Sequence, residues 1–320
     1  LKIMSEKLSR IEHFPDELFF SLFSFIYPKD LLCGWLNLNS RFDAILRSIP
    51  ISIEIRTNED LNNNLLYLQH FASQVISLQD TRLIPQTPVD VRSLTNIQYL
   101  CLMHCSNEQL KDIHPSNQPH LTRFYSLSSS LSVYERILFG EDCFSNLISF
   151  GAPKGATIQL LNRTNPINRA LRYLHLYSTS NETICQFLQY LPNLISLRIN
   201  YFYASHSTST RPSTKSCIER LTIKHILSSQ SDFNELLLSN QFPRLTQLSV
   251  VLNACEFDQL AHVLTKFLYL KHINVKIKTY PKNLDLDRIR CQSIWFRTLD
   301  YSYLKDEQND RPVLLIKKTL

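Results

Sequence analysis

Leu171-Arg-Tyr-Leu174-His-Leu176 sets a pattern that the chain repeats: an apolar residue, two variable ones, an apolar one, one variable and an apolar one. Leu194-Ile-Ser-Leu197-Arg-Ile199 follows 23 residues later, and Ile218-Glu-Arg-Leu221-Thr-Ile223 comes next. Apolar residues at alternate positions are typical of a short strand with one buried face. Self-similarity of this kind predicts a fold built from one repeated unit.

Further copies of the pattern extend in both directions along the chain. Close copies begin at Ile97, Leu245 and Leu270, and weaker ones at Val75, Leu121, Leu147 and Ile294. Successive copies start 22 to 27 residues apart. Other α/β proteins also alternate strands and helices, but a doubly wound sheet has nearly continuous apolar strands and connections of varying length. The near-constant spacing therefore predicts strands stacked in sequence order.

Between copies, apolar residues recur at helical spacing in two clear places. These residues are Ile184, Phe187, Leu188 and Leu191 in the first place, and Phe257, Leu260, Leu264 and Phe267 in the second. Asn253 with Glu256 and Asp232 with Glu235 have the spacing of a capping box, in which each side chain satisfies a free amide of the other residue. We therefore expect helices to begin at these pairs.

Two segments depart from the repeat. Tyr203 to Cys217 is rich in Ser, Thr and Pro, which predicts a loop. This loop is either a solvated turn or a phosphorylated regulatory segment. Near the C-terminus, the apolar runs Phe296 to Leu304 and Pro312 to Lys318 flank a charged stretch, which predicts a hairpin that closes the open end of the stack.

The repeated pattern resembles the leucine-rich repeat, L-x-x-L-x-L-x-x-N/C. Two copies also keep the ninth position, as Cys105 and Asn253. The resemblance implies an α/β horseshoe solenoid, in which alternate leucines of each strand point inward and a helix or turn returns over the convex side.

Residues 13 to 46 do not fit the repeat and predict three short helices. Phe14-Pro15-Asp16-Glu17-Leu18 opens the first, with a proline that is tolerated in the first turn and two acids that the helix dipole favours. Tyr27-Pro28-Lys29-Asp30 ends this helix and begins the second. Ser40 to Leu46 forms the third, with Phe42, Ile45 and Leu46 on one side.

This segment resembles the F-box, which has an L-P-x-E-L opening, an apolar helix, a proline with D-L-L, and a third helix with an early aromatic residue. Phe14 replaces the usual leucine, and Gly34 lies inside the second helix, where glycine costs about 1 kcal/mol relative to alanine. The resemblance implies a tail at 1–12, an F-box at 13–50, leucine-rich repeats at 51–303 and a cap at 304–320.

In the F-box family this motif binds the S-phase kinase-associated adaptor, which leads to a cullin scaffold and its RING subunit. The positions that match it are candidates for adaptor binding: Phe14, Pro15, Leu18, Leu22, Phe23, Leu31, Leu32 and Leu36. So short a segment cannot bury this many large apolar groups by itself. Some of them either contact the adaptor or cover the end of the repeat stack.

Composition argues against several other classes of protein. The formal charge of +6 is spread along the chain, so nucleic acid is not indicated. Four glycines are too few for the loops with which nucleotide enzymes approach phosphate, and we expect no cofactor. Cys101-Leu-Met-His104-Cys105 lies in a strand-like run whose neighbouring side chains face opposite ways, so we expect no metal.

Neither a bilayer-spanning stretch of ~20 apolar residues nor a secretory signal occurs in the sequence. We therefore expect a protein of the cytoplasm or nucleus with no membrane partner. The ten histidines are scattered, and no nucleophile motif is present, so we expect no catalytic residue. Together with the resemblance, this favours a substrate receptor of a ubiquitin ligase. A scaffold in another assembly and an enzyme of another type are the alternatives.

The residues that alternate outward along the strands indicate how a target protein would bind. They are Arg123, Tyr125, Tyr173, His175, Tyr177, Arg198, Arg220, Lys224, His272 and Lys276. None of these outward positions is acidic until Asp300. Arginine forks and tyrosines are common in binding hot spots, so we expect an acidic or phosphorylated target on this face. Basic residues kept for solubility are the alternative explanation.

Overall fold

The computed structural model describes residues 14–83, 85, 87–127, 131–140, 143–152, 167–203, 216–227, 229–238, 242–253, 256–267, 269–278, 285, 287, 300–305 and 312–319. In this part of the chain, twelve strands form one sheet. They are β1 (Ile51–Ile55), β2 (Val75–Asp80), β3 (Tyr99–Leu102), β4 (Arg123–Ser126), β5 (Ser149–Ala152), β6 (Tyr173–Ser180), β7 (Ser196–Tyr203), β8 (Arg220–Ile226), β9 (Gln247–Leu252), β10 (His272–Ile277), β11 (Asp300–Lys305) and β12 (Pro312–Thr319).

The sheet follows the order of the sequence. From β1 to β10, each strand pairs in parallel with the next one along the chain. The register sets equivalent residues side by side, so that Leu174 lies opposite Leu197 and Leu197 opposite Leu221. The predicted α/β class is thus confirmed. Strand β1, with buried residues at alternate positions, carries none of the copies found in the sequence.

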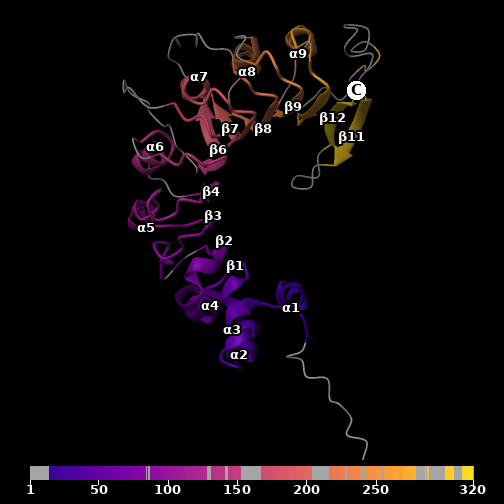
Figure 1. Cartoon of the computed structure of the whole chain (residues 1–320). Helices are drawn as coiled ribbons and strands as arrows, with labels where there is room; N and C mark the ends of the chain where they lie inside the picture. Colours follow the sequence, from indigo (N-terminus) through magenta and orange to yellow (C-terminus); the bar gives the residue numbers. More distant parts are fainter. Residues whose placement is uncertain are drawn as a thin grey trace, which may run out of the picture.

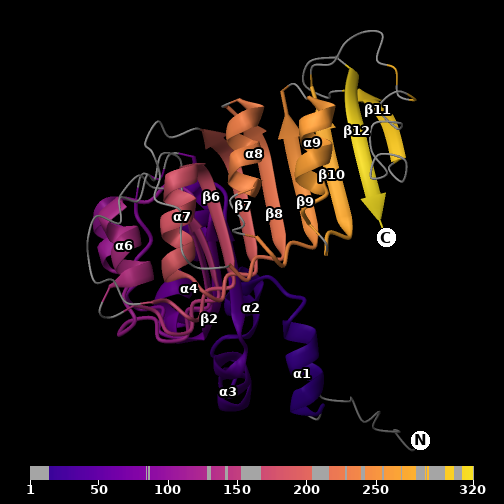
Figure 2. The same cartoon turned by 90° about the horizontal axis from the view of Figure 1, so that it is seen from above.

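Helices return the chain along one side of this sheet. They are α4 (Asn58–His70), α5 (Asn107–Lys111), α6 (Leu131–Phe139), α7 (Asn181–Tyr190), α8 (Gln230–Leu238) and α9 (Phe257–Leu264). Figure 1 shows α5 to α9 along the outer side of a curved sheet, and Figure 2 shows α7, α8 and α9 over the same face. Inward leucines and isoleucines of the strands pack against these helices in one continuous core that reaches from Ile51 to Ile316.

The two predicted capping boxes are wrong, although the helices that they predicted exist. Asn253 donates from its side-chain amide to the carbonyl of Ile226 at 3.1 Å, so it links two successive turns of the repeat. Helix α9 begins after Glu256, whose side chain makes no capping hydrogen bond. In α8 the cap lies three residues earlier than predicted, because the amide of Ser229 donates to Asp232 Oδ2 at 3.0 Å.

The three helices predicted at the N-terminus are α1 (Asp16–Phe23), α2 (Pro28–Trp35) and α3 (Ser40–Ser48). An aromatic cluster joins them: Phe19 meets Phe42 edge-on at 4.9 Å between ring centroids, and Phe23 lies 4.8 Å from Trp35. Arg41 of α3 donates to Asp16 of α1 at 2.8 Å. The helical head therefore has a core of its own.

The C-terminal end of the sheet is an antiparallel hairpin, as predicted. Strand β12 pairs with β11 on one side and antiparallel to β10 on the other. The repeat copy at Ile294, the tail at 1–12 and residues 204–215 of the predicted loop lie outside the described residues. In the described part of the chain, no helix is long and apolar enough to cross a membrane.

A buried arginine fixes the segment that follows β2. Arg82 is 2% exposed and donates to both carboxylate oxygens of Asp80, at 2.9 and 2.6 Å. It also donates to the side chain of Asn58 at 2.9 Å and to the carbonyl of Thr87 at 3.0 Å. One side chain therefore joins β2, the start of α4 and the loop that leads to β3.

Replacing Arg82 with Met should strongly destabilise the protein, because it leaves the Asp80 carboxylate buried and unpaired. The expected loss is about 3 to 5 kcal/mol in the free energy of unfolding, measured by urea denaturation. Arg92→Met is the control, since its ion pair with Asp112 at 2.8 Å leaves the Arg92 side chain 68% exposed. The control should lose less than about 1 kcal/mol. Equal losses in the two variants would show that the buried ion pair contributes no more to stability than the exposed one.

Candidate functional site

The sheet face that points away from the helices carries rows of side chains in register. One row consists of Tyr99, Arg123, Ser149, Tyr173, Ser196, Arg220, Gln247 and His272, and the next of Cys101, Tyr125, Gly151, His175, Arg198, Thr222, Ser249 and Asn274. The strand positions between these residues are buried. We call this surface the outward face. Seven of the ten residues predicted to bind a target lie in these two rows, and Tyr177, Lys224 and Lys276 follow farther along β6, β8 and β10.

Three of those ten residues, Arg198, Arg220 and His272, border one hollow of about 580 Å³. We call it the basic hollow. Its lining consists of Ser196, Arg198, Arg220, Leu221, Thr222, Gln247, Leu248, Ser249, His272, Ile273, Asn274 and Lys317. None of these described lining residues is acidic. The sequence pattern does not indicate Lys317, which antiparallel pairing of β12 with β10 places opposite Asn274.

The other predicted residues lie outside the basic hollow. Arg123, Tyr125, Tyr173, His175 and Tyr177 belong to β4 and β6, farther toward the N-terminus. Lys224 and Lys276 are exposed and lie farther along β8 and β10. The ten residues therefore do not form one pocket, and they divide between an aromatic region and a basic one.

The aromatic region depends on a missing side chain. Tyr125 of β4 stacks on His175 of β6 at 5.6 Å between ring centroids, across the intervening strand β5. On β5 the facing residue is Gly151, where a Cβ atom would lie 2.0 Å from Cδ2 of Tyr125. In the neighbouring row, Tyr201 stacks on His225 at 4.9 Å. Strict alternation of side chains along a strand does not predict that Tyr201 and His225 point outward. They do so because two successive residues of each strand face outward there.

Basic residues connect the two regions electrostatically. The guanidinium of Arg220 lies 5.5 Å from the ring centroid of Tyr173, within the range of a cation–π contact. Burial lowers the pKa of His175, and the positive charges of Arg198 and Lys224 lower it further. The hydrogen bond between His175 Nε2 and Asn200 Oδ1, at 3.2 Å, opposes this shift. Positive charges of β7 and β8 therefore act on His175 in the middle of the outward face.

Of the predicted adaptor-binding residues, some are exposed and others are not. Phe14, Leu18 and Leu22 are 45%, 55% and 46% exposed, and Pro15 beside them is also exposed. Leu18 and Leu22 lie four residues apart on one face of α1. Phe14 and Pro15 precede the helix and the exposed Phe25 follows it, and these five residues form an exposed apolar stripe on and beside α1. We call it the α1 stripe.

Two other residues of the predicted adaptor-binding set, Phe23 and Leu31, are not exposed. Both are buried in the core of the helical head, so neither is available to a partner. Leu36 is partly buried and packs against both the head core and the sheet core, which joins the two parts. Leu32 lies in α2, but its side chain lies outside the described residues.

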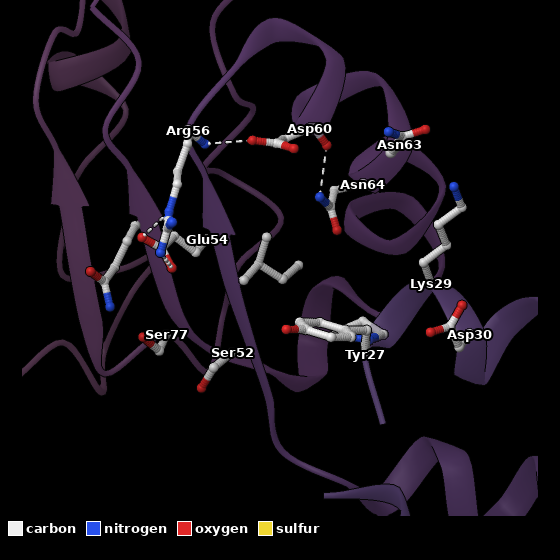
Figure 3. Close-up of a pocket in the computed structure, with 13 residues that line it drawn as sticks. Tyr27, Lys29, Asp30, Ser52, Glu54, Arg56, Asp60, Asn63, Asn64 and Ser77 are labelled. Atoms are coloured by element: carbon white, nitrogen blue, oxygen red, sulfur yellow. Dashed lines mark hydrogen bonds and ion pairs between the residues drawn. The ribbon is translucent and has the colours of Figure 1, made fainter. Parts of the chain in front are cut away.

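A second hollow, of about 630 Å³, lies between the start of α2, strands β1 and β2, and α4. Figure 3 shows that polar and charged side chains surround it. Arg56 donates to Glu54 at 2.8 Å, and the backbone amide of Arg56 donates to Asp60 at 3.0 Å. Lys29 and Asp30 line the opposite wall. Its lining has two basic and three acidic residues, so this hollow, although larger, has no excess of positive charge for an acidic ligand.

A scan against models of protein families finds no match to this chain, and a search of curated proteins finds none either. Among the described residues, no three His, Cys, Asp or Glu side chains form a group that could hold a metal ion.

Gly151→Ala should destabilise the protein, since the new methyl group displaces the ring of Tyr125 from its place on the sheet. Overpacking of this kind costs about 1 to 3 kcal/mol, which urea denaturation measures. Gly34→Ala is the matched control, because a Cβ atom at this helical position meets nothing within 4 Å. It should stabilise by about 0.5 to 1 kcal/mol. A neutral Gly151→Ala would contradict the position of Tyr125.

His175 should titrate below the ordinary histidine value of 6.5 in an NMR titration of the folded protein. Its contribution to stability is then present above about pH 6.5 and is lost as the pH falls, because only the unfolded chain takes up the proton readily. Arg198→Gln should raise the pKa of His175, because it removes a nearby positive charge. Arg123→Gln is the control and should leave it unchanged. A His175 midpoint above 6.5 would contradict its burial.

Proposed function

We propose that this chain is the substrate-recognition subunit of an SCF-type cullin-RING ubiquitin ligase. In this proposal the helical head is an F-box that binds the adaptor, and the strands form a leucine-rich-repeat solenoid that binds the target protein. The observation that carries the proposal is the α1 stripe. It coincides with the Phe14-Pro15-Asp16-Glu17-Leu18 opening that resembles the F-box.

The α1 stripe has the properties of a protein contact surface. Phe25 is 87% exposed and Leu18 55%, although neighbouring Phe19 and Phe23 show that α1 has a buried face for its own core. Burying a leucine or phenylalanine side chain contributes about 1.5 to 3 kcal/mol. An exposed apolar stripe on a short helix is therefore stabilised by a partner, and apolar patches of this kind mark interaction sites.

The outward face is the proposed target surface. It is long, lies opposite the helices and combines basic with aromatic side chains, which are frequent in binding hot spots. Its excess of arginine and lysine favours an acidic or phosphorylated target. The helical head and the outward face of the sheet then serve two different partners. The receptor acts by raising the effective concentration of target lysines near the carried ubiquitin, and it contributes no catalytic side chain.

The pair Leu18→Asp with Leu22→Asp should abolish capture of the adaptor in a pull-down with purified proteins, because each substitution places a charge in the α1 stripe. Circular dichroism should stay unchanged, as both side chains are exposed in the free chain. Leu83→Asp with Leu227→Asp is the matched control, since these leucines are 80% and 63% exposed elsewhere.

The control pair should capture the adaptor as the unchanged chain does. If the Leu18 and Leu22 pair also captures it, the α1 stripe is not the adaptor surface. If the adaptor binds but no ubiquitin transfer can be reconstituted with cullin and RING subunit, the chain is a scaffold of another assembly.

A further inference from the structure

The floor of the basic hollow is made of small hydroxyl side chains. Ser196 of β7, Thr222 of β8 and Ser249 of β9 occupy neighbouring positions of the sheet, where the longer residues Arg198, Arg220 and Gln247 stand beside them. Thr222 and Ser249 lie side by side in register on strands about 4.8 Å apart, and Ser196 lies in the next row, opposite Arg220. Each can donate a hydrogen bond to an oxygen placed above the sheet.

Positive groups surround this floor from different strands. Arg198 comes from β7, Arg220 from β8 and Lys317 from β12, and none of the described residues that line the hollow is acidic. The nearest acid in register is Asp300 of β11, which pairs with Lys317 on the side away from β10. The hollow therefore combines three formal positive charges with hydroxyl donors.

This arrangement fits a phosphate ester better than a carboxylate. A carboxylate has one charge and two oxygens in a plane, which the fork of a single arginine satisfies. A phosphate ester carries a charge of about −1.5 to −2 at pH 7 and presents three strong acceptor oxygens in different directions. Cations that converge from three strands over a floor of hydroxyl donors match the second geometry.

One acceptor in the hollow has no partner. Asn274 Oδ1 is buried and accepts no hydrogen bond from any described residue. A buried acceptor without a partner is destabilising, because it has lost its hydrogen bond to water. A peptide amide next to a phosphorylated side chain supplies the missing donor, whereas a second anion does not.

We propose that the basic hollow binds the phosphorylated serine or threonine side chain of a target protein. The phosphate group lies over Thr222 and Ser249 between Arg198, Arg220 and Lys317, and an amide of the same peptide donates to Asn274. The C-terminal hairpin is then part of the recognition surface as well as the end of the sheet. The inference rests on the proposed function insofar as the target binds the outward face.

The test uses the purified full chain and three pools of fluorescent 11-residue peptides with a fixed central residue: phosphoserine or phosphothreonine, aspartate, and unmodified serine. Fluorescence anisotropy at constant ionic strength measures the affinity of each pool. The phosphorylated pool should bind at least ~10-fold more tightly than the aspartate pool, since it accepts additional charge-assisted hydrogen bonds. Equal affinities, or no saturable binding at millimolar peptide, overturn the proposal.

Arg198→Gln, Arg220→Gln and Lys317→Gln should each weaken binding of the phosphorylated pool by ~10-fold or more. Arg92→Gln is the matched control, because Arg92 is an exposed arginine that pairs with Asp112 and is not a residue of the outward face. It should change the affinity less than twofold. If all three variants bind the phosphorylated pool as tightly as the unchanged chain does, the peptide binds elsewhere and the proposal is overturned. Inorganic phosphate that binds the hollow as tightly as the peptides points to a small phosphorylated molecule and also overturns the proposal.

These measurements need neither adaptor nor ubiquitin, so the two proposals fail separately. Loss of adaptor capture with intact phosphopeptide binding rejects the ligase role and keeps the site. Adaptor capture with no preference for phosphorylated peptides rejects the site and keeps the ligase role.

Discussion

The parallel register of the inward leucines and isoleucines is the constraint on which the rest of the structure depends. Leu174, Leu197, Leu221, Leu248 and Ile273 lie side by side across five strands, and all are buried against the returning helices. Because side chains alternate along a strand, burial of this row fixes which residues point outward. A slip of one residue in any strand would bury its basic side chains and expose its leucines.

The same register decides which residues meet on the outward face. Arg198 and Ser249 are distant in the sequence but border one hollow because their strands lie in register, and the antiparallel strand β12 adds Lys317. Gly151 shows how closely this face is packed, since the ring of Tyr125 occupies the space of the missing side chain. Close packing of this kind restricts the ring of Tyr125 before any ligand binds. Such preorganisation reduces the entropy lost on binding.

Much of this arrangement follows from the sequence, because the repeat is local and periodic. The spacing of Leu171, Leu194 and Ile218 predicts the strand order without any knowledge of distant contacts. Lys317 could not be predicted as part of the hollow, since its place depends on antiparallel pairing between β12 and β10. Asn253 likewise could not be predicted to bond with the carbonyl of Ile226 instead of capping a helix, because this contact depends on the neighbouring repeat.

In the helical head, periodicity cannot separate surface from core, because α1 is apolar around most of its circumference. Phe19 and Phe23 are buried while Leu18 and Leu22 are exposed, although all four residue types are apolar. Only packing against Trp35 and Phe42 decides which side faces inward. The exposed side is what the proposed function assigns to the adaptor.

Hydrogen–deuterium exchange of the chain with and without purified adaptor tests this division of surfaces most directly. We predict that the adaptor protects backbone amides from Phe14 through Tyr27 and leaves those of β7 to β10 unchanged. Protection of the outward strands with none in the helical head would contradict it.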